Sequence, residues 1–353
     1  MGEPLMAQEL LQQAVAARAT DIHLEPARDS LRIRLRVDGS LIFLTVLPAN
    51  EGKQLCSRIK VLAGMDIAQR MLPQDGSMRL TCREQSWDIR VASQPTILGE
   101  KLVLRLLPVQ PVEQKLTALG MAPETGEAFA RLFYKGQGLV LVTGPTGSGK
   151  TTTLYAALNL LDRERLNIMT LEDPVEYRLP EIVQTQVNYR GGLDFAAGLR
   201  GALRQDPDVM LVGEIRDPET AAISVRAALT GHLVLATMHT QDSCSAVARL
   251  LDMDCARYQV AAALNGVLAQ RLVRKPCSCQ GGCSRCYQSG YYGRTGVFEL
   301  LIATAEVRKA VLSGSPLPRP QATILDDCRA KLAAGLTDEA QFSQLALSLE
   351  DQE

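Results

Sequence analysis

The sequence predicts an α/β chain of two domains, in which a small N-terminal α+β domain precedes a larger domain built on a parallel sheet. Three observations carry this prediction. At roughly 150 residues per domain, 353 residues correspond to about two domains. Alternating polar and apolar strands fill the first part, whereas apolar strands separated by helices fill the second. Between them, the Pro-Val-Gln-Pro stretch at 108–111 favours a linker, because proline continues neither a helix nor a central strand.

The first domain is expected to begin with a helix, since residues 5–19 are rich in Leu, Ala and Gln. Leu31–Val37 alternates apolar residues with three arginines, which indicates a half-buried strand. Asp38-Gly39 then favours a tight hairpin, with a return strand at Leu41–Val46. The remaining expected elements of this domain are a helix around 53–63 and strands at 78–82, 87–92 and 101–107.

The second domain shows short apolar strands followed by helical segments, the pattern of a parallel sheet of βα units. One helix is expected to start near Thr151. The expected strands are Leu139–Thr143, Ile168–Leu171, Val209–Val212 and Leu233–Met238.

A complete phosphate-binding loop follows the first of these strands. The segment Gly-Pro-Thr-Gly-Ser-Gly-Lys-Thr at 144–151 matches the pattern G-x-x-x-x-G-K-[ST] between a strand and a helix. Its glycines allow the backbone to wrap around phosphate oxygens at a helix N-terminus, where partial positive charge favours anions. Lys150 then reaches the outer phosphates and the Thr151 hydroxyl holds Mg²⁺. The expected ATP-binding residues are Gly144, Pro145, Thr146, Gly147, Ser148, Gly149, Lys150, Thr151 and Thr152.

Hydrolysis also requires a carboxylate for Mg²⁺ and a group that orients or deprotonates water. The strand Val209–Val212 leads to Glu214, and the strand Ile168–Leu171 leads to Glu172. The strand Leu233–Met238 leads to His239. Ligands of open α/β sheets bind at the carboxyl ends of the strands, so we expect these three side chains beside the loop.

Composition excludes several classes of protein. The formal net charge is −1, from 38 basic and 39 acidic residues, which argues against a strongly basic nucleic-acid coat. No run approaches 18 consecutive apolar residues, and acidic residues stand where a signal peptide carries basic ones. These features predict a cytoplasmic protein.

Four of the nine cysteines fall within ten residues, in the pattern C-x-C-x₃-C-x₂-C. Four thiolates are the ligand set of a structural tetrahedral zinc site, and Gly281-Gly282 permits the sharp turn that so short a loop needs. The alternative is a reduced loop without metal. The expected ligands are Cys277, Cys279, Cys283 and Cys286.

In this order, the motifs resemble those of the secretion ATPase family that powers type II secretion, type IV pilus assembly and competence pseudopili. The similar segments of the second domain are its Walker A segment at 144–155, aspartate box at 170–177, Walker B segment at 203–221 and histidine box at 228–240. Those flanking it are TDIHLEP at 20–26, RVDG at 36–39, PQDG at 73–76 and RTGVFELL at 294–301. The resemblance covers about residues 19–302.

The resemblance implies a ring-shaped homo-hexamer, with ATP between the two domains and a neighbouring subunit's arginines at its phosphates. It implies a PAS-like N-terminal α+β domain at 1–108. A RecA-like ATPase domain would occupy 109–302 and include a cysteine module at 276–287. Residues 303–353 carry no assigned motif and are expected to form amphipathic helices.

It also implies roles for individual residues. Glu172 is the candidate water activator and Glu214 the Mg²⁺ carboxylate, acting through water, although the two roles could be exchanged. His239 would sense the γ-phosphate. Arg90 matches the pattern of an interdomain arginine, and Arg105 and Arg79 are weaker choices. Arg32, Arg34 and Arg36 are interpreted as a solvated strand face, and Ser77 stands where many relatives have arginine.

The partner implied by the resemblance is a polytopic platform protein of the inner membrane, which would hold this motor peripherally at the cytoplasmic membrane. The family match starts near residue 19, so we expect the extra N-terminal domain of larger members to be absent. The compact form resembles the competence pilus-assembly ATPases of Gram-positive bacteria.

Three other functions compete with assembly. A retraction motor is disfavoured by the cysteine module, which retraction ATPases generally lack. A RecA-like nucleic-acid translocase is disfavoured because no basic tract carries interleaved aromatic residues, so direct nucleic-acid binding is not expected. A non-hydrolysing, nucleotide-gated scaffold is disfavoured by the complete set of acidic motifs.

Overall fold

The computed structural model describes residues 7–82, 85–109, 115–279 and 281–350. They fall into two compact units. Unit 1 comprises Met1–Pro111, Glu176–Arg178 and Cys277–Tyr292. Unit 2 comprises Val112–Val175, Leu179–Pro276 and Gly293–Glu353. The cysteine module therefore clusters with the N-terminal part of the chain, whereas the sequence analysis placed it within the ATPase domain.

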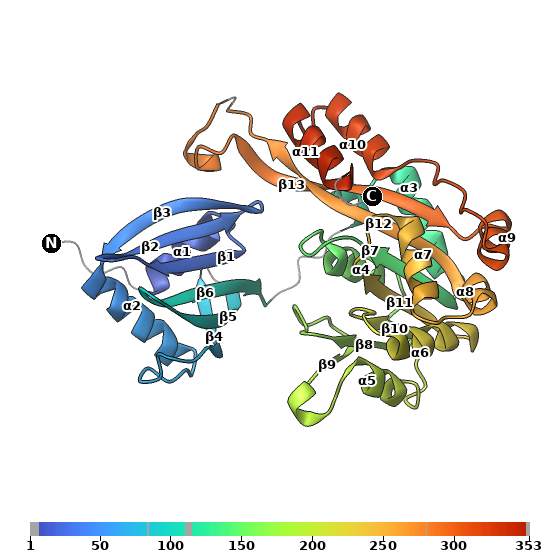
Figure 1. Ribbon diagram of the computed structural model, residues 1–353, viewed down its shortest axis with the longest axis horizontal. Helices are drawn as coiled ribbons and strands as arrows, with labels where there is room; N and C mark the ends of the chain where they lie inside the picture. The colour runs from blue at the N-terminus through green and yellow to red at the C-terminus, as the bar shows by residue number, and fades with distance from the viewer. Residues whose placement is uncertain (1–6, 83–84, 110–114, 280, 351–353) are drawn as a thin grey trace. The chain divides into compact units, whose positions relative to one another are not determined.

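Unit 1 is built on a six-stranded antiparallel sheet with strand order β3-β2-β1-β6-β5-β4. Helices α1 (Ala7–Ala16) and α2 (Ala49–Leu62) cover one face of it (Figure 1). The expected helices, hairpin and strands are all present, and the strand β1 within TDIHLEP is additional. The strands are β1 (Asp21–Pro26), β2 (Ser30–Val37), β3 (Ser40–Pro48), β4 (Gln74–Cys82), β5 (Gln85–Thr96) and β6 (Gly99–Pro108).

Alternation along the strands places the core of unit 1 between the sheet and the two helices. Apolar residues of β1 and β2 such as Ile22 and Ile33 are fully buried there, in one cluster with Leu10 and Ile59 of the helices. Charged residues occupy the intervening positions of the same strands, so the opposite face of the sheet is polar.

Unit 2 is built on a seven-stranded sheet with strand order β13-β12-β7-β11-β10-β8-β9. The pairs from β12 through β7, β11, β10 and β8 to β9 are all parallel, as the sequence predicts. Strands β9, β12 and β13 were not anticipated. The strands are β7 (Gly138–Thr143), β8 (Ile168–Glu172), β9 (Val183–Gln186), β10 (Val209–Val212), β11 (Leu233–Met238), β12 (Leu264–Pro276) and β13 (Tyr291–Ile302).

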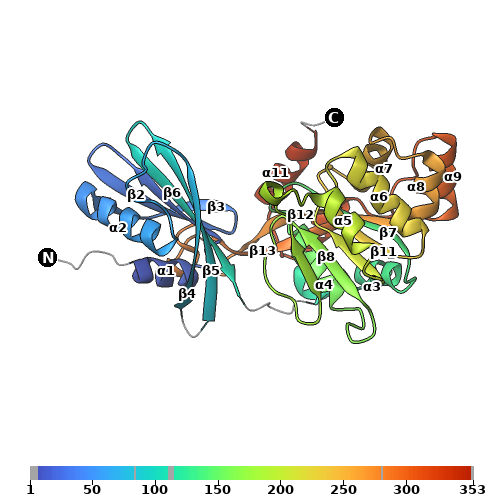
Figure 2. The same cartoon turned by 90° about the horizontal axis from the view of Figure 1, so that it is seen from below.

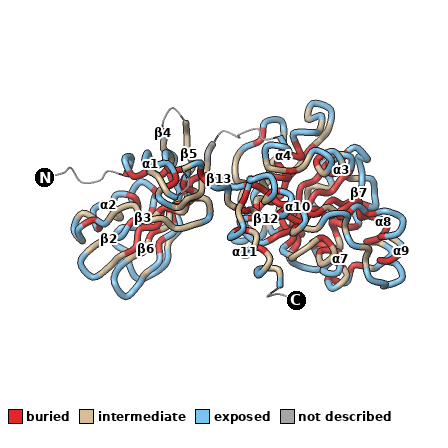
Figure 3. The backbone as a smooth tube through the Cα atoms, turned by 90° about the horizontal axis from the view of Figure 1, so that it is seen from above, coloured by how far each residue is buried: buried red, intermediate tan, exposed pale blue. Residues whose placement is uncertain are grey.

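Helices cover both faces of this sheet, with α5, α6 and α7 on one face and α3 and α4 on the other (Figure 2). Asp194, Asp217 and Asp242 cap the first three of these helices by accepting a hydrogen bond from a backbone amide of the first turn. Buried residues concentrate along the central strands of each unit (Figure 3). The helices are α3 (Pro123–Phe133), α4 (Lys150–Leu158), α5 (Phe195–Ala202), α6 (Pro218–Leu229), α7 (Ser243–Asp252) and α8 (Arg257–Ala263).

The C-terminal segment is helical, as expected, and consists of α9 (Ala305–Ser313), α10 (Ile324–Ala333) and α11 (Glu339–Glu350). Cys328 and Leu345 of the last two helices pack against Val273 and Val297 of β12 and β13. The linker expected at 108–111 falls partly outside the described residues. None of the helices in the described part of the chain combines the length and apolar character needed to cross a bilayer.

Candidate functional site

The strand order of unit 2 brings the sequence motifs to one edge of its sheet. Strand β7 ends at the phosphate-binding loop, and its parallel neighbour β11 ends just before His239. Strand β10 ends just before Glu214, and β8 ends at Glu172. The expectation that these side chains share an edge is confirmed, because parallel neighbours in register end together.

The loop itself has the tight backbone that its glycines predict. Gly144 has φ +149°, and a Cβ built there would lie 2.4 Å from the carbonyl oxygen of Gln270. Gly149, at φ +89°, is the N-cap of α4. The Ser148 hydroxyl is buried without a hydrogen-bond partner among the described residues, and such an orphaned donor fits a loop that receives phosphate oxygens.

Lys150 lies folded back over this loop. Its Nζ donates to the carbonyl oxygens of Gly144 at 2.7 Å and Pro145 at 3.0 Å. Burial lowers the pKa of Lys150 to about 8, assisted by Arg271, while the Glu214 carboxylate opposes the shift. A buried ammonium held by two neutral carbonyls gains from a dianionic or trianionic phosphate, so this placement fits a nucleotide.

Glu214 is paired with two cationic or ionisable neighbours. Its carboxylate lies 2.6 Å from Nη2 of Arg216 and 3.4 Å from Nε2 of His239. Burial lowers the pKa of His239, and the Lys150 and Arg216 cations lower it further, against the opposing pull of Glu214. A neutral imidazole beside the loop is therefore the form expected at neutral pH.

Glu172 has a different environment from Glu214. Its side chain is 3% exposed and accepts hydrogen bonds from Oγ1 of Thr170 at 2.5 Å and Nε2 of Gln184 at 3.2 Å. The hydroxyl of Tyr155, on α4, also donates to it. Its backbone lies beside the Walker B segment, since the amide of Gly213 donates to Leu171 O at 2.7 Å.

Threonine side chains tie the strand ends together. Oγ1 of Thr143, the last residue of β7, accepts from the backbone amide of Thr240 at 2.9 Å. The two hydroxyls of this pair are 2.7 Å apart. Thr237 Oγ1 donates to the carbonyl of Gly213. His239 is thus flanked by links to the phosphate-binding loop on one side and to the Walker B segment on the other.

Sequence reasoning missed several residues of this edge, and two of them lie within segments quoted for the family resemblance. Arg216 stands within the quoted Walker B segment, so its proximity to Glu214 could have been suspected. Tyr155 likewise lies within the Walker A segment. Gln270 and Arg271 come from β12, and their role depends on its pairing with β7. Nε2 of Gln270 donates to Ser148 O at 2.6 Å, and Nη2 of Arg271 donates to Gln241 O at 2.8 Å.

The candidate arginines of the N-terminal sheet belong to unit 1 and are described by their own surroundings. Arg105 donates from Nε to Asp21 at 3.0 Å, and Arg79 pairs with Asp88 at 2.6 Å. Arg90, on β5, lies opposite Arg105 on β6.

The three arginines of β2 are more constrained than a solvated strand face. Arg32 and Arg34 are ion-paired with Glu25, at 3.1 and 2.7 Å. Arg36 is ion-paired with Asp21 at 3.9 Å. The Arg34 guanidinium is the main cause that lowers the pKa of Glu25 to about 2. Two carboxylates of β1 therefore organise the basic side chains on this face of the sheet.

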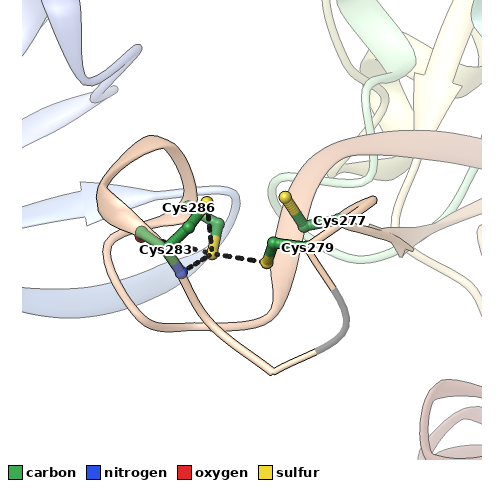
Figure 4. Close-up of side chains that lie close together, drawn as sticks. All are labelled: Cys277, Cys279, Cys283 and Cys286. Carbon is green, nitrogen blue, oxygen red and sulfur yellow. Dashed lines mark hydrogen bonds between the residues drawn. The ribbon is translucent and has the colours of Figure 1, made fainter.

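The four clustered cysteines converge in one loop (Figure 4). Their sulfur atoms all lie within 4.8 Å of one another. Sγ of Cys286 is 3.6 Å from Sγ of Cys279 and 3.7 Å from Sγ of Cys283. A tetrahedral zinc with Zn–S bonds of about 2.3 Å requires sulfur separations of about 3.8 Å, so the donor set fits this metal.

The module packs within unit 1. Tyr287 contacts the hydrophobic core beneath the N-terminal sheet. The ring of Tyr292 lies between two guanidinium groups, 3.7 Å from Arg18 and 3.9 Å from Arg285. These contacts explain why residues 277–292 cluster with the N-terminal part of the chain despite their position in the sequence.

Comparison with known proteins gives a consistent result. The family model for the type II/IV secretion system protein matches residues 2–342. The type II secretion system protein HxcR of Pseudomonas aeruginosa is 50% identical over 88% of this chain and 68% of its own length. The type II secretion system protein E of Dickeya dadantii is 45% identical over 93% of this chain and 72% of its own.

Solved structures show the same fold. The ATPase DotB of Legionella pneumophila superposes with a TM-score of 0.76 at 24% identity, covering 98% of this chain and 96% of that one. The pilus retraction motor PilT with bound ADP gives a TM-score of 0.67 at 25% identity, covering 97% of each chain. With these likenesses beside the convergent loop, carboxylates and histidine, the chain belongs to the type II/IV secretion system protein family.

Proposed function

We propose that this chain is an ATP-hydrolysing motor that powers pseudopilin or pilus assembly for type II secretion, type IV pili or competence DNA uptake. The observation that carries the proposal is the convergence of Lys150, Glu214 and His239 at one sheet edge. Relatives at 45–50% identity are type II secretion proteins, which supports assembly over the other candidates.

ATP would be held by residues 144–152, and Mg²⁺ by Thr151 and Glu214. The fit rests on the orphaned hydroxyl of Ser148 and on the ammonium of Lys150 at the mouth of the same loop. A bound Mg²⁺ would neutralise part of the negative charge on the phosphates of ATP. Lys150 would exchange its carbonyl partners for phosphate oxygens, and the loop amides would orient the phosphates.

Glu172 would activate water and Glu214 would hold the metal through water, with His239 sensing the γ-phosphate. The exchanged assignment is separable by experiment. Glu172→Gln should lower the rate of single-turnover hydrolysis by about 10²–10⁴-fold while leaving the Mg²⁺ concentration for half-maximal nucleotide binding unchanged. Glu214→Gln should raise that concentration. The reverse pattern would exchange the two roles.

Arg90 and Arg105 are proposed to contact nucleotide phosphates. Replacing either by alanine should lower hydrolysis more in the assembled protein than in isolated chains. Arg131, an exposed arginine of α3 that is ion-paired with Glu127, serves as the matched control. An equal effect of all three replacements would contradict the assignment.

The cysteine module is proposed to hold one structural Zn²⁺ through Cys277, Cys279, Cys283 and Cys286. Two sulfur separations of 3.6 and 3.7 Å, within a set whose members all lie within 4.8 Å of one another, support it. Because the module packs on the core of unit 1, the metal would fix Tyr287 and Tyr292 against that unit.

The assembled form is proposed to be a homo-hexamer attached peripherally to the cytoplasmic membrane through a polytopic platform protein. Affinity purification from membranes should recover a polytopic partner together with six copies of this chain. Recovery of a monomer without a membrane partner would contradict this part of the proposal.

Genetic complementation tests the function itself. In cells lacking this gene, the wild-type chain should restore pseudopilus or pilus fibres, and Lys150→Ala should not. Hyperpiliation of cells that lack this gene would instead identify a retraction motor. The structural likeness to the pilus retraction motor PilT is the reason to test this alternative. ATPase stimulation by single-stranded DNA that falls steeply with salt would identify a translocase.

A further inference from the structure

We propose that Tyr155 is a positioning residue for hydrolysis, because its phenol, with Thr170 and Gln184, forms a hydrogen-bonding cradle that fixes the carboxylate of Glu172. The inference rests on the proposed role of Glu172 as water activator. It adds to that role the residues that orient the base and connect it to the phosphate-binding helix.

Three elements supply the cradle. Tyr155 comes from α4, the helix that begins at the phosphate-binding loop, and its hydroxyl donates to Oε2 of Glu172. Thr170 comes from β8 and donates to Oε1 at 2.5 Å. Gln184 comes from β9 and donates to Oε1 at 3.2 Å. Donors from three directions define the plane of the carboxylate as well as its position.

The cradle is dry. Tyr155 is 1% exposed, Thr170 is 2% exposed and Glu172 is 3% exposed. A buried polar group without a hydrogen-bond partner is destabilising, so rotation of Glu172 away from its donors would leave several buried groups unsatisfied at once. The carboxylate therefore has one strongly preferred orientation, in contrast to Glu214, whose partner Arg216 has a largely exposed side chain.

The hydrogen bonds accepted by the two carboxylate oxygens of Glu172 indicate where a water molecule would bind. Each carboxylate oxygen accepts about two hydrogen bonds. Oε1 accepts from two side chains, whereas Oε2 accepts from the Tyr155 hydroxyl among the interactions described above. The second lone pair of Oε2 is thus the position at which Glu172 would receive a hydrogen bond from the attacking water.

The cradle also links two motifs mechanically. Tyr155 follows Thr151 by four residues on α4, so the two side chains lie one helical turn apart. A displacement of α4 on phosphate binding would reach Glu172 through the Tyr155 hydroxyl. Tyr155 therefore connects occupancy of the loop to the orientation of the base.

The test is a double-mutant cycle on the purified full chain with Mg-ATP. Tyr155→Phe removes the hydroxyl and keeps the buried ring. Orientation of a general base accounts for part of its 10²–10⁴-fold contribution, so kcat should fall by about tenfold with KM changed less than about twofold. In the Glu172→Gln background the same change should have no further effect, because there is no longer a base to position.

Two further variants separate positioning from packing. Thr170→Val removes a cradle donor at nearly constant shape and should lower kcat about as much as Tyr155→Phe does. Thr170→Ser retains the hydroxyl and should keep kcat close to the wild-type value. Tyr134→Phe removes the hydroxyl of an exposed tyrosine and should leave kcat and the melting temperature unchanged.

The outcomes are distinguishable. Wild-type or increased kcat in Tyr155→Phe, or additive losses in the double variant, would overturn the cradle while leaving the role of Glu172 standing. Wild-type kcat in Glu172→Gln would overturn the proposed role of Glu172, and the cradle with it. If Tyr155→Phe does not fold, the comparison of Thr170→Val with Thr170→Ser tests the inference instead. Equal kcat values in these two variants would overturn it.

Discussion

Replacing Gly144 by alanine should destabilise unit 2 far more than the same change at Gly147, three residues away in the same loop. Both glycines have positive φ, +149° and +79°. A Cβ at residue 144 would lie 2.4 Å from the carbonyl oxygen of Gln270 and 2.7 Å from the hydroxyl oxygen of Ser148. A Cβ at residue 147 would meet nothing within 4 Å. The pair therefore separates steric overlap from backbone strain.

The magnitudes follow from these two terms. Gly147→Ala carries only the cost of a left-handed residue, roughly 1–2 kcal/mol. Gly144→Ala carries backbone strain of roughly 1–3 kcal/mol, plus overpacking of roughly 1–3 kcal/mol. The carbonyl of Gln270 belongs to β12, which is paired with β7, so it can move only slightly away from an added Cβ. The central estimates are about 4 and about 1.5 kcal/mol for the two variants.

Differential scanning calorimetry measures the difference directly. For a unit of this size, each kcal/mol shifts the melting temperature by about 2–4 °C, so Gly144→Ala should lose about 8–16 °C and Gly147→Ala about 3–6 °C. Gly231→Ala, also at positive φ without close neighbours, provides a control away from the loop. Equal losses at residues 144 and 147 would refute the close approach of β12 to the loop.

Four further predictions test other parts of the account. ATP binding at pH 9 should take up on the order of one proton, because phosphate raises the pKa of Lys150 from its lowered value of about 8. Calorimetry in buffers of different ionisation enthalpy measures this uptake, and Lys150→Arg, always charged, should show none. The same lowered pKa means that stability should rise with pH between about 8 and 10.5, where the unfolded chain binds more protons. The purified protein should contain about one zinc per chain, and a chelator or Cys283→Ser should lower the melting temperature; far less zinc with unchanged melting would leave a metal-free loop. Thr143→Val should reduce the free energy of unfolding by about 1–3 kcal/mol and Thr143→Ser by much less, since only valine leaves Thr240 without its partner. Equal losses in urea unfolding would contradict this link.

The edge of the sheet at which the site lies could be predicted from the sequence. Parallel strands identified by apolar runs end at the same edge of their sheet, so these runs alone place Glu172, Glu214 and His239 beside the loop. The order of those strands was not predictable from these runs. That β11 separates β7 from β10 places His239 next to Glu214, and this depends on packing over the whole sheet.

The environments of the two carboxylates could not be predicted. Both follow apolar strands, yet Glu172 is buried by donors from α4 and β9, whereas Glu214 lies between Arg216 and His239. The cysteine module shows the same limit. Its position in the sequence indicated the ATPase domain, but Tyr287 and Tyr292 pack with unit 1. These tertiary contacts join residues that are far apart in the sequence.

ATP hydrolysis by the purified full chain tests the central claim most directly. The account predicts turnover that requires Mg²⁺ and is abolished by Lys150→Ala and by Glu214→Ala, with Tyr134→Phe at the wild-type rate. Hydrolysis at the wild-type rate in both the Lys150 and Glu214 variants would contradict the assignment of this site as the motor's catalytic centre.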